Sequence, residues 1–370
     1  MCKRGFPAQI LKQRPTFPVF GIAIDRSWVG KASKLWGETL KQESTSEISQ
    51  NSKFVTEAVF CFKSLLQRVF MPLPELEVYY CVRRKHRFKQ GKKLKHIRLR
   101  EAFYPVFTKF LTLDRFFRKQ TITVFGNQKK YKDRVIFACT HIGENDLENI
   151  YEVLHRSCWW FVGDPCVLYK DISGLLLYLN GCILLETMDK DDRHIAYLRA
   201  LELLKGGGSL MIFPEGARNG SENLPVMPLF QGTAKMAMET NTKIVPIATE
   251  QYDKRFVVNF GTEIYPENYS GSAELTQELR DALASLKWEI WEREGLFSRD
   301  SLPENFREQF IKTFEKRLQP WDTLESVERT RFHTKAEIEQ REAFAHLNNL
   351  IPSRENAFLW NKRYYNPGKQ

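Results

Sequence analysis

Residues 135–155 read VIFACTHIGENDLENIYEVLH, a short apolar run followed directly by an amphipathic one. The run Val135–Thr140 carries no charge and is rich in residues that favour strands, so it predicts a buried strand. From about Glu144 to His155 the apolar residues recur with helical spacing, which predicts a helix. A buried strand that leads straight into a helix is the repeating unit of α/β proteins, and this stretch sets the expected fold class.

The same alternation continues from about residue 121 to 262. Helices are expected over Ile172–Leu179, around residues 195–204 and around 231–240, where Gly206 ends the second of them. Further strands are expected at Cys158–Val162, Cys182–Glu186, Ser209–Phe213, Lys243–Ala248 and Arg255–Phe260. This order predicts an α/β fold with a layered, mostly parallel sheet flanked by helices.

The flanks add helical segments at both ends of this core. Residues 1–55 predict a weakly ordered lead-in, and 56–120 an amphipathic and basic region. The core is then expected to span residues 121–270. Residues 271–370 predict a helical extension, because one apolar stripe runs through Leu275, Leu279, Leu283, Leu286 and Ile290.

The net charge of +11 is concentrated in one segment of the chain. Residues 81–100 hold ten Lys or Arg and no acid, which leaves 46 basic against 45 acidic residues elsewhere. Such a run favours an anionic membrane surface or an anionic polymer, although a solvated charged face is the alternative. Together with the amphipathic segment, it predicts that residues 56–120 face a membrane.

The seven cysteines are scattered without a CxxC pair, which favours a reducing compartment and argues against a structural zinc site. No run reaches the roughly 18 apolar residues of a membrane span, and the N-terminus lacks the apolar stretch of a secretory signal. The expected location is therefore cytoplasmic, peripheral on the inner face of the membrane.

Two short segments carry the chemistry that the sequence predicts. In the first, His141 follows the strand and Asp146 stands five residues later. On a continuous helix five positions are separated by roughly 140°, so His141 must lie on the turn before the helix, where Gly143 permits a bend. A neutral imidazole accepts a hydroxyl proton, and a carboxylate on its other nitrogen fixes the tautomer.

In the second segment, a strand ends in Phe213-Pro214-Glu215-Gly216-Ala217-Arg218. Pro214 ends the hydrogen-bonding ladder and Gly216 permits a close turn. Glu215 and Arg218 are then expected at the carboxyl end of the strand, where open α/β sheets bind ligands. An Arg side chain there suits a phosphate group.

Together the two segments resemble the glycerolipid acyltransferase family, which includes the 1-acylglycerol-3-phosphate O-acyltransferases. That family carries His-x4-Asp and, later, Phe-Pro-Glu-Gly followed by Thr or Ala and Arg. Two further blocks agree in order, Pro228–Ala237 and Val245–Ile247. The resemblance covers roughly residues 121–262.

The resemblance implies that His141 is the base and Asp146 its partner. Phe213, Pro214, Glu215, Gly216 and Arg218 are expected in the substrate-binding pocket. It further implies a lysophospholipid acceptor, 1-acylglycerol-3-phosphate above others, and acyl-CoA or acyl carrier protein as co-substrate. No bound cofactor and no metal are implied, and no nucleic acid is expected as a partner.

One departure from the family pattern concerns the acceptor. The family's second motif usually ends in an Arg that helps to hold the acceptor phosphate, but here Gly181–Glu186 is followed by Thr187. Lys190 and Arg193 are the nearby substitutes. The same chemistry on a different lysolipid is therefore the main alternative. A further alternative is an inactive relative that binds anionic polymers through its basic segment.

Overall fold

The computed structural model describes residues 73–94, 97–143, 145–163, 165, 177–221, 224–295, 305–318 and 323–334. The predicted lead-in, the amphipathic helix at 56–72 and most of the helix at 172–179 lie outside these residues. The chain divides into two compact units, Met1–Val78 and Tyr79–Gln370, and the fold described here is that of the second.

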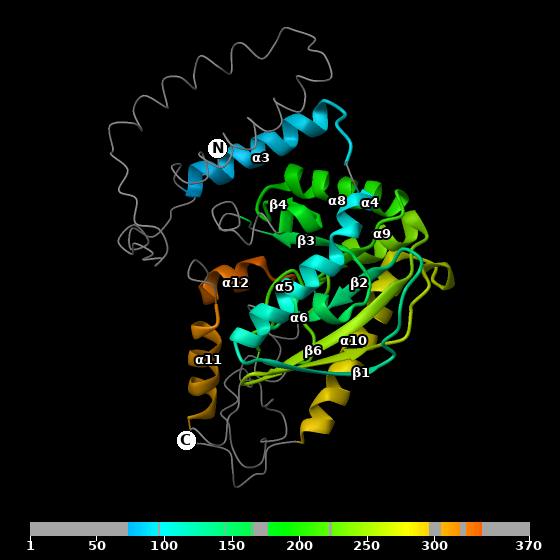
Figure 1. The fold of residues 1–370 in the computed structure, drawn as a ribbon. Coiled ribbons are helices and arrows are strands. Elements are labelled where there is room, and N and C mark those ends of the chain that lie inside the picture. The colour runs from blue at the N-terminus through cyan, green and yellow to red at the C-terminus, as the bar shows by residue number, and fades with distance from the viewer. Residues whose placement is uncertain are drawn as a thin grey trace, which may run out of the picture. The chain divides into compact units, whose positions relative to one another are not determined.

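A seven-stranded sheet forms the centre of this unit, with the order β1-β7-β6-β2-β5-β3-β4 (Figure 1). Strands β6, β2, β5, β3 and β4 are parallel, β7 runs antiparallel to β6, and β1 is parallel to β7. The prediction of a mostly parallel sheet is confirmed. The strands are β1 Thr121–Gly126, β2 Ile136–Cys139, β3 Trp159–Gly163, β4 Cys182–Leu185, β5 Leu210–Ile212, β6 Ile244–Tyr252 and β7 Arg255–Phe260.

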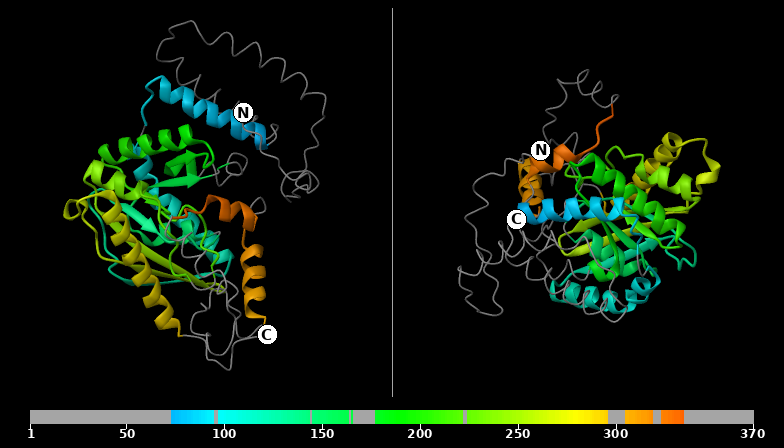
Figure 2. Two further views of the ribbon diagram at one scale, coloured as in Figure 1. Left: turned by 180° about the vertical axis from the view of Figure 1, so that it is seen from behind. Right: turned by 90° about the horizontal axis from the view of Figure 1, so that it is seen from above.

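Helices cover both faces of the sheet (Figures 1 and 2). One face carries α8, α9 and α10, and the other carries α5 and α6. The 3-10 helix Pro266–Asn268 precedes α10. The helices are α3 Leu73–Lys89, α4 Ile97–Ala102, α5 Tyr104–Phe117, α6 Asp146–Val153, α8 Lys190–Lys205, α9 Gly232–Thr240, α10 Ser272–Glu294, α11 Phe306–Lys316 and α12 Leu324–Thr330.

Strand β2 shows why the sequence forms this layered core. Ile136 and Ala138 face the cluster under α8 and α9, whereas Phe137 and Cys139 face the cluster under α5 and α6. All four side chains are buried, because a central parallel strand with helices on both sides has no solvent-facing surface. The uninterrupted apolar run in the sequence is the signature of that position.

Two strands differ from the sequence prediction. The edge strand β1 was not expected, since it is half-exposed and its residues are not uniformly apolar. Strand β6 extends to Tyr252, four residues past the expected end at Ala248. Its last residues include the polar Thr249 and Glu250, yet both are fully buried. Helix α10 packs on β6 and β7, so the predicted boundary at residue 270 separates this helix from the sheet it covers.

Part of the basic run makes contacts inside the protein rather than with solvent. Arg84 binds both carboxylate oxygens of the buried Asp192, at 3.1 and 3.2 Å from its Nε. Lys85 Nζ lies 2.6 Å from Asp189, the residue that caps α8. Two of the ten basic residues of segment 81–100 therefore attach helix α3 to the acidic start of α8.

Candidate active site

His141 lies on the turn between β2 and α6, as the sequence predicts. Strand β2 ends at Cys139 and helix α6 begins at Asp146, so the two side chains meet across the turn. His141 Nδ1 lies 2.6 Å from Asp146 Oδ2. The imidazole is 22% exposed and the carboxylate is buried, so only the histidine is accessible from outside.

Asp146 is held as an ionised acceptor. The backbone N–H groups of Ile142 and Gly143 donate to the same Oδ2, at 2.9 and 3.2 Å. Burial raises the pKa of Asp146, but the nearby His141 and these hydrogen bonds outweigh burial and hold the pKa below its usual range. Gly143 thus contributes its amide to the turn, in addition to the bend that the sequence predicts.

This pairing sets the chemistry of the imidazole. A carboxylate accepts only, so Nδ1 carries the proton and donates, and Nε2 is left as an acceptor. An imidazole in this tautomer can remove a proton from a hydroxyl group, and Asp146 stabilises the imidazolium that forms. The arrangement is that of a general base with its orienting carboxylate.

Phe213, the residue after β5, lies against the ring of His141. The two ring centroids are 4.3 Å apart and the rings are 19° from parallel. Strands β2 and β5 are neighbours and parallel, so their carboxyl ends bring these side chains to one edge of the sheet. The ring of Phe213 thus packs against one face of the imidazole and restricts its rotation.

Glu215 contacts the backbone of His141 from inside the protein and does not face solvent. The carboxylate is fully buried and accepts two backbone hydrogen bonds, from His141 N at 3.1 Å and Met227 N at 2.9 Å. Burial raises the pKa of Glu215, and the two amides, Lys287 and His141 partly offset that increase. Sequence patterns do not predict these contacts, because hydrogen bonds to backbone amides do not require particular residue types.

The rest of the Pro-Glu-Gly segment forms a compact loop around His141. Asn219 N donates to the carbonyl oxygen of His141 at 2.8 Å, and Pro214 O accepts from Phe230 N at 3.0 Å. Gly216 is exposed and has φ of 69°, a conformation that favours glycine. Arg218 follows on the same loop and is half-buried. The backbone of His141 is thus held on both sides, by Glu215 and by Asn219.

Aromatic residues from α11 and from the segment after α12 lie against this loop. The rings of Phe230 and Phe332 are 4.9 Å apart, and a Cβ at Gly220 would stand 2.6 Å from the ring of Phe314 on α11. Helices α11 and α12 lie beside the edge where the parallel strands end (Figures 1 and 2). The extension after residue 271 therefore contributes to the surroundings of the site.

Thr187 lies at the same edge of the sheet, two residues after β4. A Cβ on Gly163, the last residue of β3, would stand 2.8 Å from Thr187 Cγ2. The guanidinium of Arg193 donates to the carbonyl oxygen of Thr187. Arg193 and Lys190, the two substitutes that the sequence offers, are both exposed, and Arg193 is the one that contacts Thr187.

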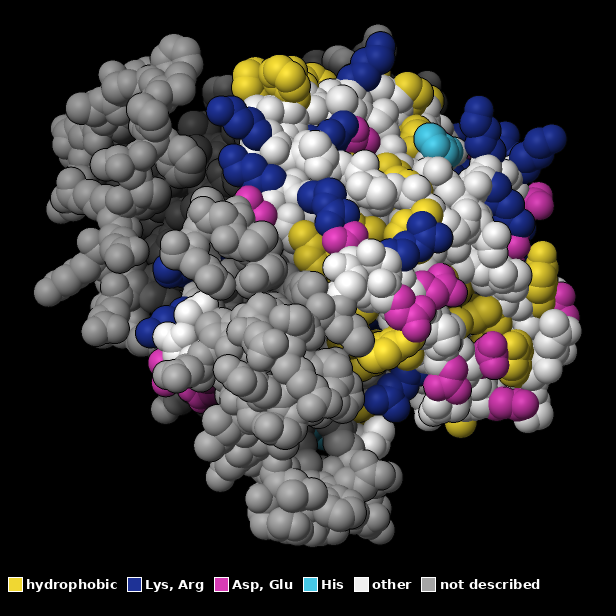
Figure 3. Space-filling view, turned by 90° about the horizontal axis from the view of Figure 1, so that it is seen from below, with side chains coloured by type: hydrophobic (Ala, Val, Ile, Leu, Met, Phe, Trp, Pro, Cys, Tyr) yellow, Lys and Arg dark blue, Asp and Glu magenta, His cyan; other side chains and the backbone are white. Residues whose placement is uncertain are grey.

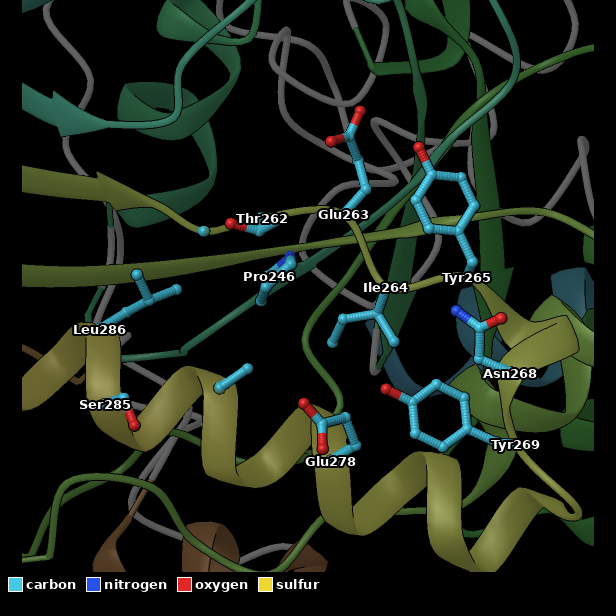
Figure 4. Close-up of a pocket in the computed structure, with 12 residues that line it drawn as sticks. Pro246, Thr262, Glu263, Ile264, Tyr265, Asn268, Tyr269, Glu278, Ser285 and Leu286 are labelled. Carbon is cyan, nitrogen blue, oxygen red and sulfur yellow. The ribbon is translucent and has the colours of Figure 1, made fainter.

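A pocket elsewhere in the molecule is separate from this site. Figure 4 shows it between α10 and the loop after β7, with Pro246, Ile264, Tyr265 and Leu286 among its lining residues. Ile264 pairs with Ile244, the first residue of β6, so the pocket lies towards the edge where the parallel strands begin. Among the described residues, no group of three or more His, Cys, Asp or Glu is placed to hold a metal ion.

The two motifs lie in the part of the chain that matches a known family model. Residues 121–250 match the acyltransferase family model. The chain is similar to the 1-acyl-sn-glycerol-3-phosphate acyltransferase of Borreliella burgdorferi, with 25% identity over 153 residues, 40% of this chain and 54% of that relative. The chain thus spans about half the length of this curated relative.

A solved structure is also similar, the 1-acyl-sn-glycerophosphate acyltransferase of Thermotoga maritima. The match has 17% sequence identity and a TM-score of 0.44, and it covers 64% of this chain and 98% of that one.

We expect Gly216→Ala to destabilise the fold more than Gly207→Ala does. Both glycines have a positive φ, but a Cβ at Gly216 would stand 2.4 Å from the ring of Phe230, whereas a Cβ at Gly207 would meet nothing within 4 Å. Gly207→Ala should therefore cost about 1 kcal/mol, and Gly216→Ala about 2 kcal/mol or more, because it adds the steric conflict. Urea unfolding measures both; equal losses would show that Phe230 moves aside freely.

Proposed function

We propose that the protein is an O-acyltransferase that moves a fatty acyl group from a thioester to the hydroxyl of a lysophospholipid. The supporting observation is the 2.6 Å contact between His141 and Asp146 beside the Pro-Glu-Gly turn. The donor is acyl-CoA or acyl carrier protein. The name of the similar bacterial relative favours 1-acylglycerol-3-phosphate as acceptor, with phosphatidic acid as product.

The transfer proceeds directly between the two substrates. His141 Nε2 takes the proton of the acceptor hydroxyl while its oxygen attacks the thioester carbonyl carbon. As the carbon–oxygen ester bond forms, the carbon–sulfur bond breaks, and the thiolate leaves with the proton that the imidazolium returns. Asp146 stabilises the imidazolium during this exchange, and Glu215 and Phe213 keep the ring in place.

The acceptor phosphate requires a cation near the site. Arg218 stands on the loop that follows Glu215, and Arg193 is held at Thr187. A guanidinium binds phosphate through two parallel hydrogen bonds. We assign Arg218 and Arg193 to the phosphate; the Thr187 substitution keeps a different lysolipid headgroup as the second candidate acceptor.

The first test removes the base. His141→Ala and Asp146→Asn should each lower kcat by on the order of 10²–10⁴-fold. The first variant lacks the base. In the second, the amide N–H of the asparagine donates to Nδ1, so the ring proton moves to Nε2, which can then no longer accept a proton. Release of free CoA from acyl-CoA, measured with a panel of lysophospholipids, reports the rate. His194→Ala is the control, since this histidine is exposed on α8. Near-normal transfer by His141→Ala would remove the base assignment.

The second test addresses the acceptor. Arg193→Met should raise KM for a phosphate-bearing acceptor by about 10-fold or more while kcat changes little, because one charge-assisted contact is lost. Lys190→Met, in the first turn of the same helix, is the matched control and should keep the wild-type KM. An equal rise in KM with monoacylglycerol, which lacks the phosphate, would contradict this role for Arg193.

We further propose that α4 and α5 lie on an anionic membrane. Leu99, Val106, Phe110, Leu113 and Phe117 recur at helical spacing across these helices, and their side chains are between 48% and 71% exposed. The opposite side of α5 is buried through Phe107 and Leu111. In the space-filling view, exposed hydrophobic side chains lie near Lys and Arg side chains in the upper part of the face (Figure 3).

An apolar stripe flanked by basic residues suits attachment to a lipid surface. Lys109 on α5 and Lys119 just after it are exposed and supply positive charge. No helix in the described ranges is long and apolar enough to cross a membrane. Within the predicted membrane-facing region, residues 56–120, we assign the contact with lipid to the stripe on α4 and α5.

Flotation with phosphatidylglycerol vesicles tests this attachment. The double variant Phe110→Ser/Phe117→Ser should bind the vesicles at least about 10-fold more weakly than the wild type, because two exposed aromatic side chains no longer enter the lipid. Tyr265→Ser, a change of an exposed ring just before the 3-10 helix Pro266–Asn268, is the control. Wild-type binding to vesicles by both variants, or no binding by the wild type at low salt, would contradict the proposal.

A further inference from the structure

Two buried hydroxyl groups connect β6 to the residue that precedes His141. Thr140 directly follows β2, Thr249 lies on β6, and both residues are fully buried. Thr249 N donates to Thr140 Oγ1 at 2.9 Å, and Thr249 Oγ1 donates to Thr140 O at 3.2 Å. The two hydroxyl oxygens are 3.2 Å apart. Because a hydroxyl has one proton and that of Thr249 goes to the carbonyl oxygen, Thr140 Oγ1 donates to Thr249 Oγ1.

These hydroxyls take the place of a backbone hydrogen bond between two strands. Strands β2 and β6 are parallel, Cys139 pairs with Ile247, and Thr140 N donates to Ile247 O at 3.0 Å. In a regular parallel ladder the next bond would run from Thr249 N to Thr140 O. Here Thr249 N donates to Thr140 Oγ1 instead, and Thr140 O accepts from the other hydroxyl. Strand β2 therefore leaves the ladder at Thr140, one residue before the proposed base.

The peptide unit between Thr140 and His141 is bound at both of its polar ends. Its carbonyl oxygen accepts from Thr249 Oγ1. Its N–H, which belongs to His141, donates to Glu215 Oε1 at 3.1 Å, on the loop after β5. A peptide unit is planar and includes the following Cα, so hydrogen bonds at its two ends determine how that plane is turned. The direction in which the imidazole leaves the backbone therefore depends on both bonds.

We propose that Thr249 is a positioning residue for acyl transfer, whose hydroxyl orients the peptide unit that carries His141. This role rests on the proposed function of His141 as the base. Thr249 acts through the carbonyl oxygen of Thr140, on the side of the turn that faces β6. It lies two residues after Val245–Ile247, the last of the blocks that resemble the family, so the resemblance assigns no role to it.

Thr249→Val and Thr249→Ser separate the hydroxyl from the shape of the side chain. Valine leaves Thr140 O without its donor, so kcat should fall about 10- to 100-fold through misplacement of the base. KM for the lysophospholipid and for acyl-CoA should change less than about 3-fold, because no contact with substrate is removed. Serine keeps the hydroxyl and should restore kcat to near the wild-type value. Release of free CoA measures both variants.

Thr242→Val is the matched control. Thr242 belongs to a second pair of buried threonines, in which Thr240 Oγ1 and Thr242 Oγ1 are 2.8 Å apart just before β6 begins. Thr242→Val and Thr249→Val each remove one buried hydroxyl from such a pair, so both should lower the midpoint of urea unfolding. Only Thr249→Val should lower kcat. The proposal is overturned if Thr249→Val keeps the wild-type kcat, or if Thr242→Val lowers kcat as much.

The double variant Thr140→Val/Thr249→Val keeps the proposal testable if Thr249→Val does not fold. Without the hydroxyls, the N–H of residue 249 and the carbonyl oxygen of residue 140 bond directly and complete the ladder, so both buried groups have a partner and the variant should fold. The direct bond turns the peptide unit before His141 towards β6, so kcat should stay at least about 10-fold below the wild type. A folded double variant with the wild-type kcat would contradict the role.

One readout requires no substrate and separates this role from the proposed function. The low-field NMR signal of the His141 Nδ1 proton reports its bond to Asp146, and it should shift in Thr249→Val but not in Thr242→Val. If the signal shifts in a protein that transfers no acyl group, the proposed function is wrong, but the effect of Thr249 on the His141 turn is supported. An unshifted signal in Thr249→Val would overturn the positioning role.

Discussion

The position of His141 depends on a small set of hydrogen bonds to groups buried beneath it. Its amide donates to Glu215, its carbonyl oxygen accepts from Asn219, and its ring bonds to Asp146. Two of these three partners come from the loop after β5, and the third from the start of α6. The parallel order of β2 and β5 makes this possible, because it places both loops at one edge of the sheet.

The same arrangement concentrates negative charge in the protein interior. Asp146, Glu215 and Glu250 are all buried near this edge, and a buried carboxylate is stable only with nearby donors or cations. Asp146 has His141 and two amides, Glu215 has two amides, and Glu250 has Lys287 and Trp291. Each of these carboxylates thus has donors or a cation beside it, and two of them, Asp146 and Glu215, bind His141 directly.

The sequence predicts the fold better than it predicts the contacts of the site. The buried strand at residues 136–139 and the turn before Asp146 follow from an apolar run and from helix geometry, which are local properties. Edge strand β1 escapes prediction because half-exposed strands have no uniform apolar run. The role of Glu215 as an acceptor for two amides, and the pairing of Arg84 with Asp192, arise from contacts between distant residues and leave no local pattern.

Helices α10 and α11, which lie outside residues 121–250, pack against the elements that hold the site. Helix α10 brings Lys287 to the end of β6, and α11 packs Phe314 against Gly220, the residue after Asn219. Asn219 in turn binds the carbonyl oxygen of His141. Because buried contacts transmit displacement through a close-packed interior, a shift of α10 or α11 would also move His141. The placement of His141 therefore depends on contacts beyond residues 121–250, although the two motifs lie within that range.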